Sequence, residues 1–280
     1  MTIKDLLVHV DPTPTTQARL ETAFVLAERF DAQVTALYLI AEPFLRSMAG
    51  RHMPDQILRE HLAQAEAEAE AAFTALREAA AKRKVRLRTL RETGSLDRLP
   101  GLLARDARNS DLVIVGQPNP QTGGSDEALL VEAAFLETGR PALVVPHAGM
   151  RAVPPKRVVV AWDASREASR AVHDALPLLK LAEDVVVLVV DAQGLGARLG
   201  REPGKGVAAH LSLHGVKVRV KHVESDRRSI GEFILAQAEE EGADLLVMGG
   251  YGHSRLREML VGGVTRYMLE HATVPVLLAH

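Results

Sequence analysis

The sequence predicts an α/β protein built from two similar halves, each an open parallel β-sheet covered by helices. The 280 residues suffice for two domains of about 140 residues each. Short apolar runs alternate with amphipathic stretches along the whole chain, which is typical of successive strand–helix–strand units. The apolar runs are continuous in Val, Leu and Ile, which indicates strands buried on both faces.

Three segments of the first half recur in the same order in the second. Residues 6–11 (LLVHVD) match 158–163 (VVVAWD), 111–116 (DLVIVG) match 244–249 (DLLVMG), and 141–145 (PALVV) match 275–279 (PVLLA). Because the flanking Asp, Gly and Pro residues stay in register, the pattern indicates an internal duplication. We therefore predict two domains, 1–147 and 155–280, joined by a stretch that contains Pro and Gly.

Each half contains five candidate strands. They are 4–10, 33–40, 85–90, 111–116 and 141–145 in the first half, and 157–162, 184–191, 216–223, 244–249 and 274–279 in the second. The Ala-, Glu- and Leu-rich segment 57–83 predicts a long helix. A terminal strand leaves unpaired backbone groups at a sheet edge. We expect 142–145 and 276–279 to cover each other's edges, which gives an internal pseudo-dimer.

Composition excludes several classes of function. The chain has no Cys, so disulfides, iron–sulfur clusters and thiolate zinc sites are absent. A formal net charge of -2 gives no reason to expect a nucleic-acid or acidic-membrane partner. The N-terminus lacks the features of a signal peptide, and no apolar run approaches the ~20 residues that span a bilayer. We expect a cytoplasmic protein.

The segment 247–265, VMGGYGHSRLREMLVGGVT, carries the pattern that is most informative about chemistry. It leaves a predicted buried strand at Gly249, continues through Gly252, and reaches Gly262 and Gly263 before a predicted helix, 264–271. Residues without Cβ allow the backbone to approach a ligand closely. The free N–H groups at a helix N-terminus suit a phosphate. A plain glycine-rich turn is the alternative.

Topology suggests the other side of a ligand pocket. In open parallel sheets, ligands bind beyond the carboxyl ends of the strands, where the winding direction reverses. If the first and fourth strands of the second half are neighbours there, Asp163 and Gly249 flank one crevice. The Asp163 carboxylate could then accept hydrogen bonds from an adenine amine or a ribose hydroxyl.

These residues resemble a known family. The pattern Gly249-x2-Gly252-x9-Gly262 resembles the ATP-binding signature of the universal stress protein family, and Asp163 after 158–160 is similar to its opening strand. The tail 266–278 looks like its closing helix and strand, and the resemblance covers nearly the whole chain.

The resemblance implies sheets of strand order 3-2-1-4-5, contact through the last strands, and binding of ATP or a related adenine nucleotide such as AMP. It implies that the base contacts Ala161 and Asp163, with Val190 on the neighbouring strand. It also implies that the ribose and phosphates contact a second group, which comprises Gly249, Gly252, Gly262, Gly263 and Thr265.

The second half departs from the family pattern at one position. Gly263 stands where ATP-binding members usually have Ser or Thr, and Thr265 is the nearest substitute hydroxyl. We expect binding to be weaker by about 1 kcal/mol for one lost hydrogen bond.

The first half departs further. Asp11 and Gly116 are retained, but Asn119 stands where Gly252 would, and Ala128 or Leu129 replaces the third glycine. Asp126 and Glu127 add negative charge beside any phosphate. We therefore predict no nucleotide site in this half, which would instead pair with the second half and steady it.

Two further motifs suggest other sites and are set aside. Residues 200–206 resemble a P-loop but are one residue short and lack Ser or Thr after the lysine. His210 and His214 have a spacing that metals can use, but no third ligand lies nearby in the sequence. We expect no metal site.

No Ser/His/Asp set can be placed around the crevice, and Asp163 is its single carboxylate, so the sequence favours binding over catalysis. The leading hypothesis is a stress-response regulator that binds ATP or AMP and passes its occupancy to a protein partner. A structural pseudo-dimer without ligand and a slow adenine-nucleotide hydrolase are the alternatives. Association of two chains into a homodimer is left open.

Overall fold

Strands and helices alternate along the chain, as the periodicity predicts. The computed structural model describes residues 2–42, 55–119, 124–147, 149–150, 152–191, 202–225, 229–251 and 263–280. Residues 2–147 are called the first half below, and residues 152–280 the second half.

The first half contains strands β1 (Asp5–Val10), β2 (Gln33–Ala41), β3 (Arg86–Gly94), β4 (Leu112–Gly116) and β5 (Ala142–Val145), with helices α1 (Thr16–Phe30), α2 (Asp55–Arg83), α3 (Leu99–Ala107) and α4 (Gly124–Leu136). The second half contains strands β6 (Arg157–Ala161), β7 (Asp184–Val190), β8 (Val218–Val223), β9 (Leu245–Gly249) and β10 (Val276–Ala279), with helices α5 (Arg166–Leu179), α7 (Lys205–Leu213), α8 (Ile230–Glu240) and α10 (Val264–His271).

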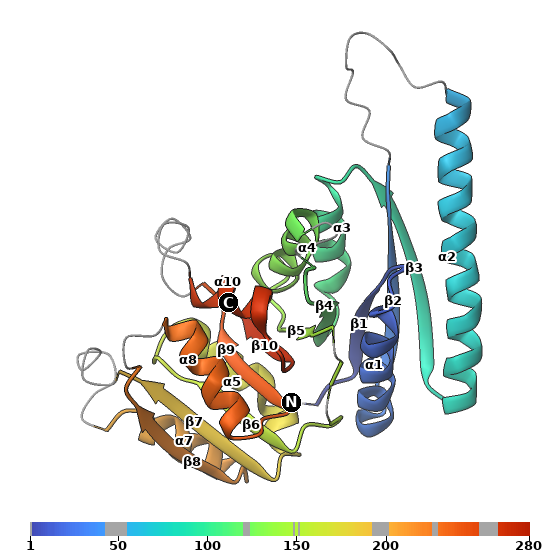
Figure 1. The fold of residues 1–280 in the computed structure, drawn as a ribbon. Helices are drawn as coiled ribbons and strands as arrows, with labels where there is room; N and C mark the ends of the chain where they lie inside the picture. Colours follow the sequence, from blue (N-terminus) through green and yellow to red (C-terminus); the bar gives the residue numbers. More distant parts are fainter. Residues whose placement is uncertain are drawn as a thin grey trace, which may run out of the picture.

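All ten strands form one continuous sheet. Its order is β3-β2-β1-β4-β5-β10-β9-β6-β7-β8, so each half has the expected order 3-2-1-4-5. Neighbours within each half are parallel, whereas β5 and β10 are antiparallel, with Leu143 opposite Leu277. The expected pairing of 142–145 with 276–279 is therefore confirmed. It joins the two sheets edge to edge (Figure 1).

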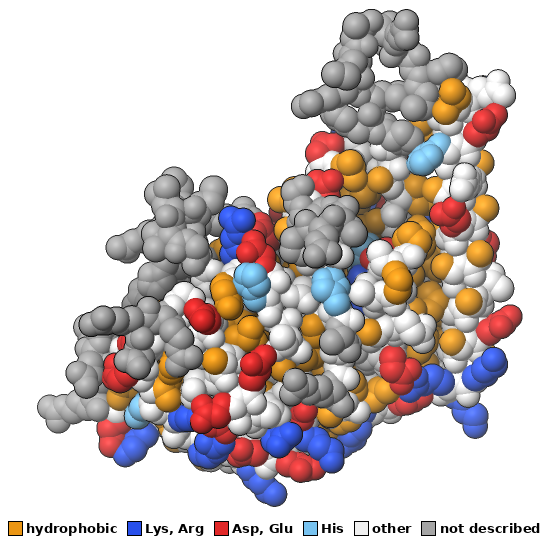
Figure 2. Space-filling model, in the orientation of Figure 1, with side chains coloured by type: hydrophobic (Ala, Val, Ile, Leu, Met, Phe, Trp, Pro, Cys, Tyr) orange, Lys and Arg blue, Asp and Glu red, His pale blue; other side chains and the backbone are white. Residues whose placement is uncertain are grey.

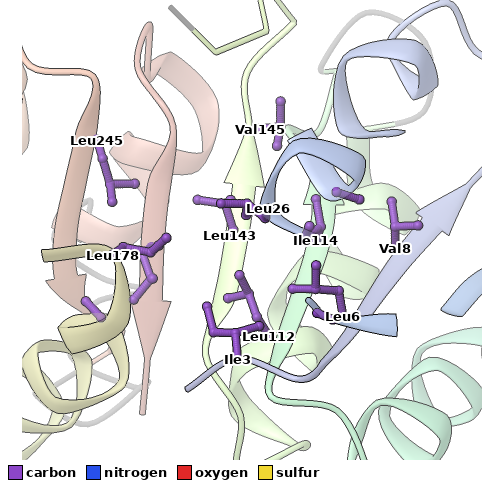
Figure 3. Close-up of a cluster of buried hydrophobic side chains, with 14 of the residues drawn as sticks. Ile3, Leu6, Val8, Leu26, Leu112, Ile114, Leu143, Val145, Leu178 and Leu245 are labelled. Carbon is purple, nitrogen blue, oxygen red and sulfur yellow. The ribbon is translucent and has the colours of Figure 1, made fainter. Parts of the chain in front are cut away.

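Helices cover both faces of this sheet, and each face has an apolar core that runs through both halves. One core contains side chains of α1, α2, α5 and α7, and the other contains side chains of α3, α4, α8 and α10. Figure 3 shows Leu143 of β5 lying between Ile114 and Leu112 of the first half and Leu178 and Leu245 of the second. The last strands therefore share a core as well as backbone hydrogen bonds.

The outer edge of the first half is longer than its sequence predicts. The expected strand 85–90 continues to Gly94, because β3 pairs with β2 along its whole length. The exposed Arg86, Arg88 and Arg91 interrupt the apolar pattern, since an edge strand is covered only in part. The long helix α2 runs along this edge (Figure 1).

Charges of both signs are mixed on the surface. On the face drawn in Figure 2, Lys and Arg side chains alternate with Asp and Glu along the lower edge. Among the described residues, no helix combines the length and apolar character needed to traverse a bilayer.

Truncation of Leu277 tests the junction between the two sheets. Leu277 is fully buried in β10 opposite Leu143, and loss of a buried Leu side chain typically costs about 2–5 kcal/mol. We expect Leu277→Ala to lower the free energy of unfolding in urea by this amount. Leu213→Ala is the matched control, because Leu213 is 87% exposed. Equal stability of the two variants would argue against a shared core.

Candidate functional site

The predicted site lies at the carboxyl ends of three neighbouring strands of the second half. β6 lies between β7 and β9, which is where the winding direction of the chain reverses. Ala161, Val190 and Gly249 are the last residues of β6, β7 and β9. Ala161 pairs with Leu188 in the register of β6 and β7, so Asp163 comes level with Val190. The fold thus brings these four predicted residues to one edge of the sheet.

Asp163 forms the turn between β6 and α5. Its Oδ1 accepts the N–H of Ser165 at 3.0 Å, and the Ser165 hydroxyl caps α5 by accepting the N–H of Ala168. Among the described residues, none hydrogen-bonds the second carboxylate oxygen, Oδ2. The half-buried Asp163 therefore keeps one carboxylate oxygen without a hydrogen-bond partner among the described residues.

Gly249 and Gly250 have packing reasons of their own. A Cβ on Gly249 would lie 2.6 Å from the backbone nitrogen of Ala168, so a side chain would push α5 away from β9. A Cβ on Gly250 would lie 2.5 Å from the Phe135 ring of the first half. These two glycines are needed for close packing whether or not a ligand is bound.

The helix that was expected to meet the phosphates begins where the sequence places it. Gly263 is the N-cap of α10 in an extended conformation, which leaves the first N–H groups of the helix without intrahelical partners. Thr265 is 2% exposed, and its Oγ1 accepts the N–H of Tyr251 at 3.0 Å. This contact ties the end of β9 to the first turn of α10. Gly252 and Gly262 lie outside the described residues, and all the predicted ligand contacts stay predictions.

An internal ion pair occupies the matching place in the first half. Arg19 of α1 is 3% exposed, and its Nη2 lies 2.7 Å from Oδ2 of Asp11. The same guanidinium lies over Gly116, where a Cβ would collide with Nη1. In this half a cation of the chain itself thus neutralises the carboxylate that corresponds to Asp163.

A cavity of about 220 Å³ remains beside this ion pair. Its wall includes Val115, Leu130 and Val131, together with the carboxylate of Glu127. Glu127 accepts the backbone N–H of Asn119 at 2.7 Å. The carboxylate that the sequence places near this loop therefore does line the cavity, where it would repel a phosphate.

His9 in the same cavity has a strongly perturbed pKa. Burial, with the nearby Arg19 guanidinium, lowers the pKa of His9 to about 4, against a partial opposing effect of Asp11. Burial by itself would raise the pKa of the Asp11 carboxyl, but Arg19, His9 and the neighbouring hydroxyls together hold that pKa well below its usual range. At neutral pH the pocket therefore contains a neutral imidazole and a charged Asp–Arg pair.

The sequence pointed to His210 and His214 as a pair but did not show that His173 lies beside them. The ring centroids of His173 in α5 and His210 in α7 are 5.1 Å apart. The ring centroids of His210 and His214 are 4.7 Å apart. α5 and α7 cover the same face of the sheet, so residues far apart in the sequence meet there. Within the described part of the chain, no group of three His, Cys, Asp or Glu residues is arranged to hold a metal ion.

One protein-family model matches both halves of the chain. The sequence model of the family described as "Universal stress protein family" matches residues 2–130 and 154–280. Universal stress protein Slr1230 of Synechocystis sp. is 37% identical over 62 residues, which are 22% of this chain and 19% of that protein. Universal stress protein MJ0577 of Methanocaldococcus jannaschii is 41% identical over 46 residues, 16% of this chain and 28% of that protein. The matches thus span less than a third of either relative.

Solved structures match the chain over its whole length. A universal stress protein from Archaeoglobus fulgidus DSM 4304 superposes with a TM-score of 0.76 at 17% identity, covering 99% of this chain and 96% of that one. A putative universal stress protein from Pseudomonas aeruginosa UCBPP-PA14 gives a TM-score of 0.62 at 16% identity, covering 99% and 93%. At these identities the likeness concerns the fold.

The low pKa of His9 predicts a pH-dependent loss of stability. Between pH 6.5 and about 4, the unfolded chain takes up a proton at His9 that the folded chain does not, so the free energy of unfolding falls as the pH is lowered. We expect a loss on the order of 1–3 kcal/mol over this window, at about 1.4 kcal/mol per pKa unit. Urea unfolding of the wild type and His9→Gln at several pH values measures it.

The variant should lose less stability than the wild type in that window. Asp11 acts at lower pH, because the ordinary pKa of its carboxyl is 3.8. Identical pH profiles for the two proteins would contradict the assignment to His9.

Proposed function

The chain belongs to the universal stress protein family, and we propose that it is a stress-response regulator whose second half binds an adenine nucleotide, ATP or AMP. Residues 1–147 and 155–280 are the two domains of this proposal, and the first of them binds no nucleotide. It serves instead as the partner that the second domain packs against. A protein partner in the cytoplasm then receives the signal of nucleotide occupancy.

The observation that carries the proposal is the placement of Asp163. Its Oδ2 has no partner among the described residues, and Asp163 follows the carboxyl end of β6, which lies beside β9. In the sequence, the glycine segment connects β9 to α10. A carboxylate suits an adenine amine or a ribose hydroxyl, and the start of α10 suits a phosphate. In the first half, Arg19 already pairs with the corresponding Asp11.

We propose binding without catalysis, since no acidic or basic side chain among the described residues hydrogen-bonds Asp163. The direct test is to denature the purified protein and to chromatograph the small molecules that it releases. Adenine nucleotide near one equivalent per chain supports the proposal. An empty supernatant, with no heat on titration with ATP, supports the ligand-free scaffold, and conversion of added ATP into ADP supports the hydrolase.

Replacement of Asp163 tests the base and ribose side of the pocket. Asp163→Asn keeps an oxygen for the N–H of Ser165 but removes the charge, and a hydrogen bond to a charged group is worth about 1.5–3 kcal/mol. We expect the dissociation constant for ATP, measured by calorimetry, to rise about tenfold or more. Asp11→Asn is the matched control and should leave the constant unchanged. An equal effect of both changes would place the nucleotide elsewhere.

Replacement of Gly252 tests the phosphate side. By the family resemblance the backbone at Gly252 lies against the phosphates, so Gly252→Val should abolish detectable ATP binding in the same titration. Gly206→Val serves as a control, because a Cβ on Gly206 would meet no atom within 4 Å. Unaltered binding by Gly252→Val would show that the phosphates have been misplaced.

A further inference from the structure

Tyr251, the residue that leads into the glycine segment of the second half, is anchored on the first half. Its hydroxyl donates to Oε1 of Glu132 at 2.5 Å, and its ring stacks on Phe135 with centroids 6.0 Å apart and planes 17° apart. Glu132 and Phe135 both belong to α4, which lies on the side of the first half nearest β10 (Figure 1). The contacts therefore join residues 119 positions apart in the chain.

The backbone of Tyr251 is held in a conformation that its side chain disfavours. Its φ is +52°, in the left-handed region, which is costly for residues with a bulky side chain. Such a conformation persists only where the surroundings impose it. Here the constraints are the contacts of the Tyr251 side chain with α4 and the bond from its N–H to Thr265.

The preceding residue is held as well. The N–H of Gly250 donates to the carbonyl of Ala279 at 2.9 Å, and its carbonyl oxygen lies 2.9 Å from Nδ1 of the His280 ring. The missing side chain of Gly250 makes room for Phe135. Three connections, to β10, to α10 and to α4, thus converge on residues 250 and 251.

These connections control both ends of the segment that the proposed function assigns to phosphate binding. The bond from Tyr251 to Thr265 brings the residue before the segment to the first turn of the helix after it. The side chain of Tyr251 then sets this pair of ends relative to α4. A shift of α4 would move Tyr251, and the two ends of the segment with it.

We propose that Tyr251 is a positioning residue of the nucleotide site and that α4 of the first half is a structural part of that site. The first half, to which the proposed function assigns no nucleotide, holds Tyr251 through Glu132 and Phe135, and through Tyr251 it holds Thr265 in the first turn of α10. Nucleotide binding and the state of α4 are therefore coupled, and the coupling acts equally in both directions. This inference rests on the proposed function.

Calorimetric titration with ATP and magnesium tests the positioning role. Tyr251→Ala removes the stacked ring and the hydrogen bond, and should raise the dissociation constant about tenfold or more. Tyr251→Phe and Glu132→Ala each remove the hydrogen bond but keep the ring stacked on Phe135, and each should raise the dissociation constant about threefold. The double variant should be no worse than either single one, because both remove the same bond. Glu132→Gln, which keeps an acceptor, should restore the wild-type constant.

A control separates positioning from general destabilisation. Ile114→Val trims a fully buried side chain of the first half, in the core on the other face of the sheet from Phe135. It should lower the thermal unfolding midpoint without changing the dissociation constant for ATP. Tyr251→Phe should raise the dissociation constant for ATP while leaving the thermal unfolding midpoint unchanged.

Amide hydrogen exchange tests the coupling itself. Addition of ATP to the wild type should slow exchange in α4, in the other half of the chain, and Tyr251→Ala should abolish this slowing at saturating ATP. If the wild type binds no ATP, the proposed function fails and this inference with it. Two results would overturn the inference alone, provided that the wild type binds ATP. One is an equal dissociation constant for ATP in Tyr251→Phe, Glu132→Ala and Ile114→Val. The other is unchanged amide exchange in α4 when ATP is added.

Discussion

The antiparallel pairing of β5 with β10 holds the two halves together and sets their relative position. Each of these strands would otherwise leave a row of unpaired backbone groups at a sheet edge. Their pairing makes one sheet of ten strands and extends both apolar cores across the junction. It also brings α4 of the first half to the end of β9 in the second, where Phe135 occupies the space left by Gly250. The two halves are therefore neighbours at the candidate site as well as along the sheet.

The halves share a topology but differ in the side chains at the carboxyl ends of their central strands. In the second half, α5 packs closely on Gly249, and the Asp163 carboxylate keeps one oxygen without a partner among the described residues. In the first half, the side chain of Arg19 lies on Gly116 and pairs with Asp11. One buried guanidinium thus supplies the donor that the Asp11 carboxylate would otherwise take from a ligand or from water. The carboxylate of the first half is therefore compensated within the chain itself, and it would be left uncompensated if Arg19 were removed.

Glycine in the motif has two roles that the sequence alone does not separate. Gly249 and Gly250 are required by the packing of α5 and of Phe135, so their presence is no evidence for a ligand. The proposal of a ligand site rests instead on Asp163 and on Tyr251. Contacts from both halves hold Tyr251 in a disfavoured backbone conformation. Strain of this kind is maintained by the surrounding contacts, and it gathers where a backbone must be held in one place.

The fold class, the duplication, most strand positions and the place of Asp163 at the end of β6 could all be predicted before the structure was known. These follow from local patterns: continuous apolar runs, repeated flanking residues and a glycine-rich stretch before a helix. Four features became visible only in the folded chain: the length of β3, the pairing of Arg19 with Asp11, the proximity of His173 to His210, and the anchoring of Tyr251 on α4. Such contacts depend on which helices share a face and which edges meet. These arrangements arise only when the whole chain is packed, so they cannot be predicted from a short segment of the sequence.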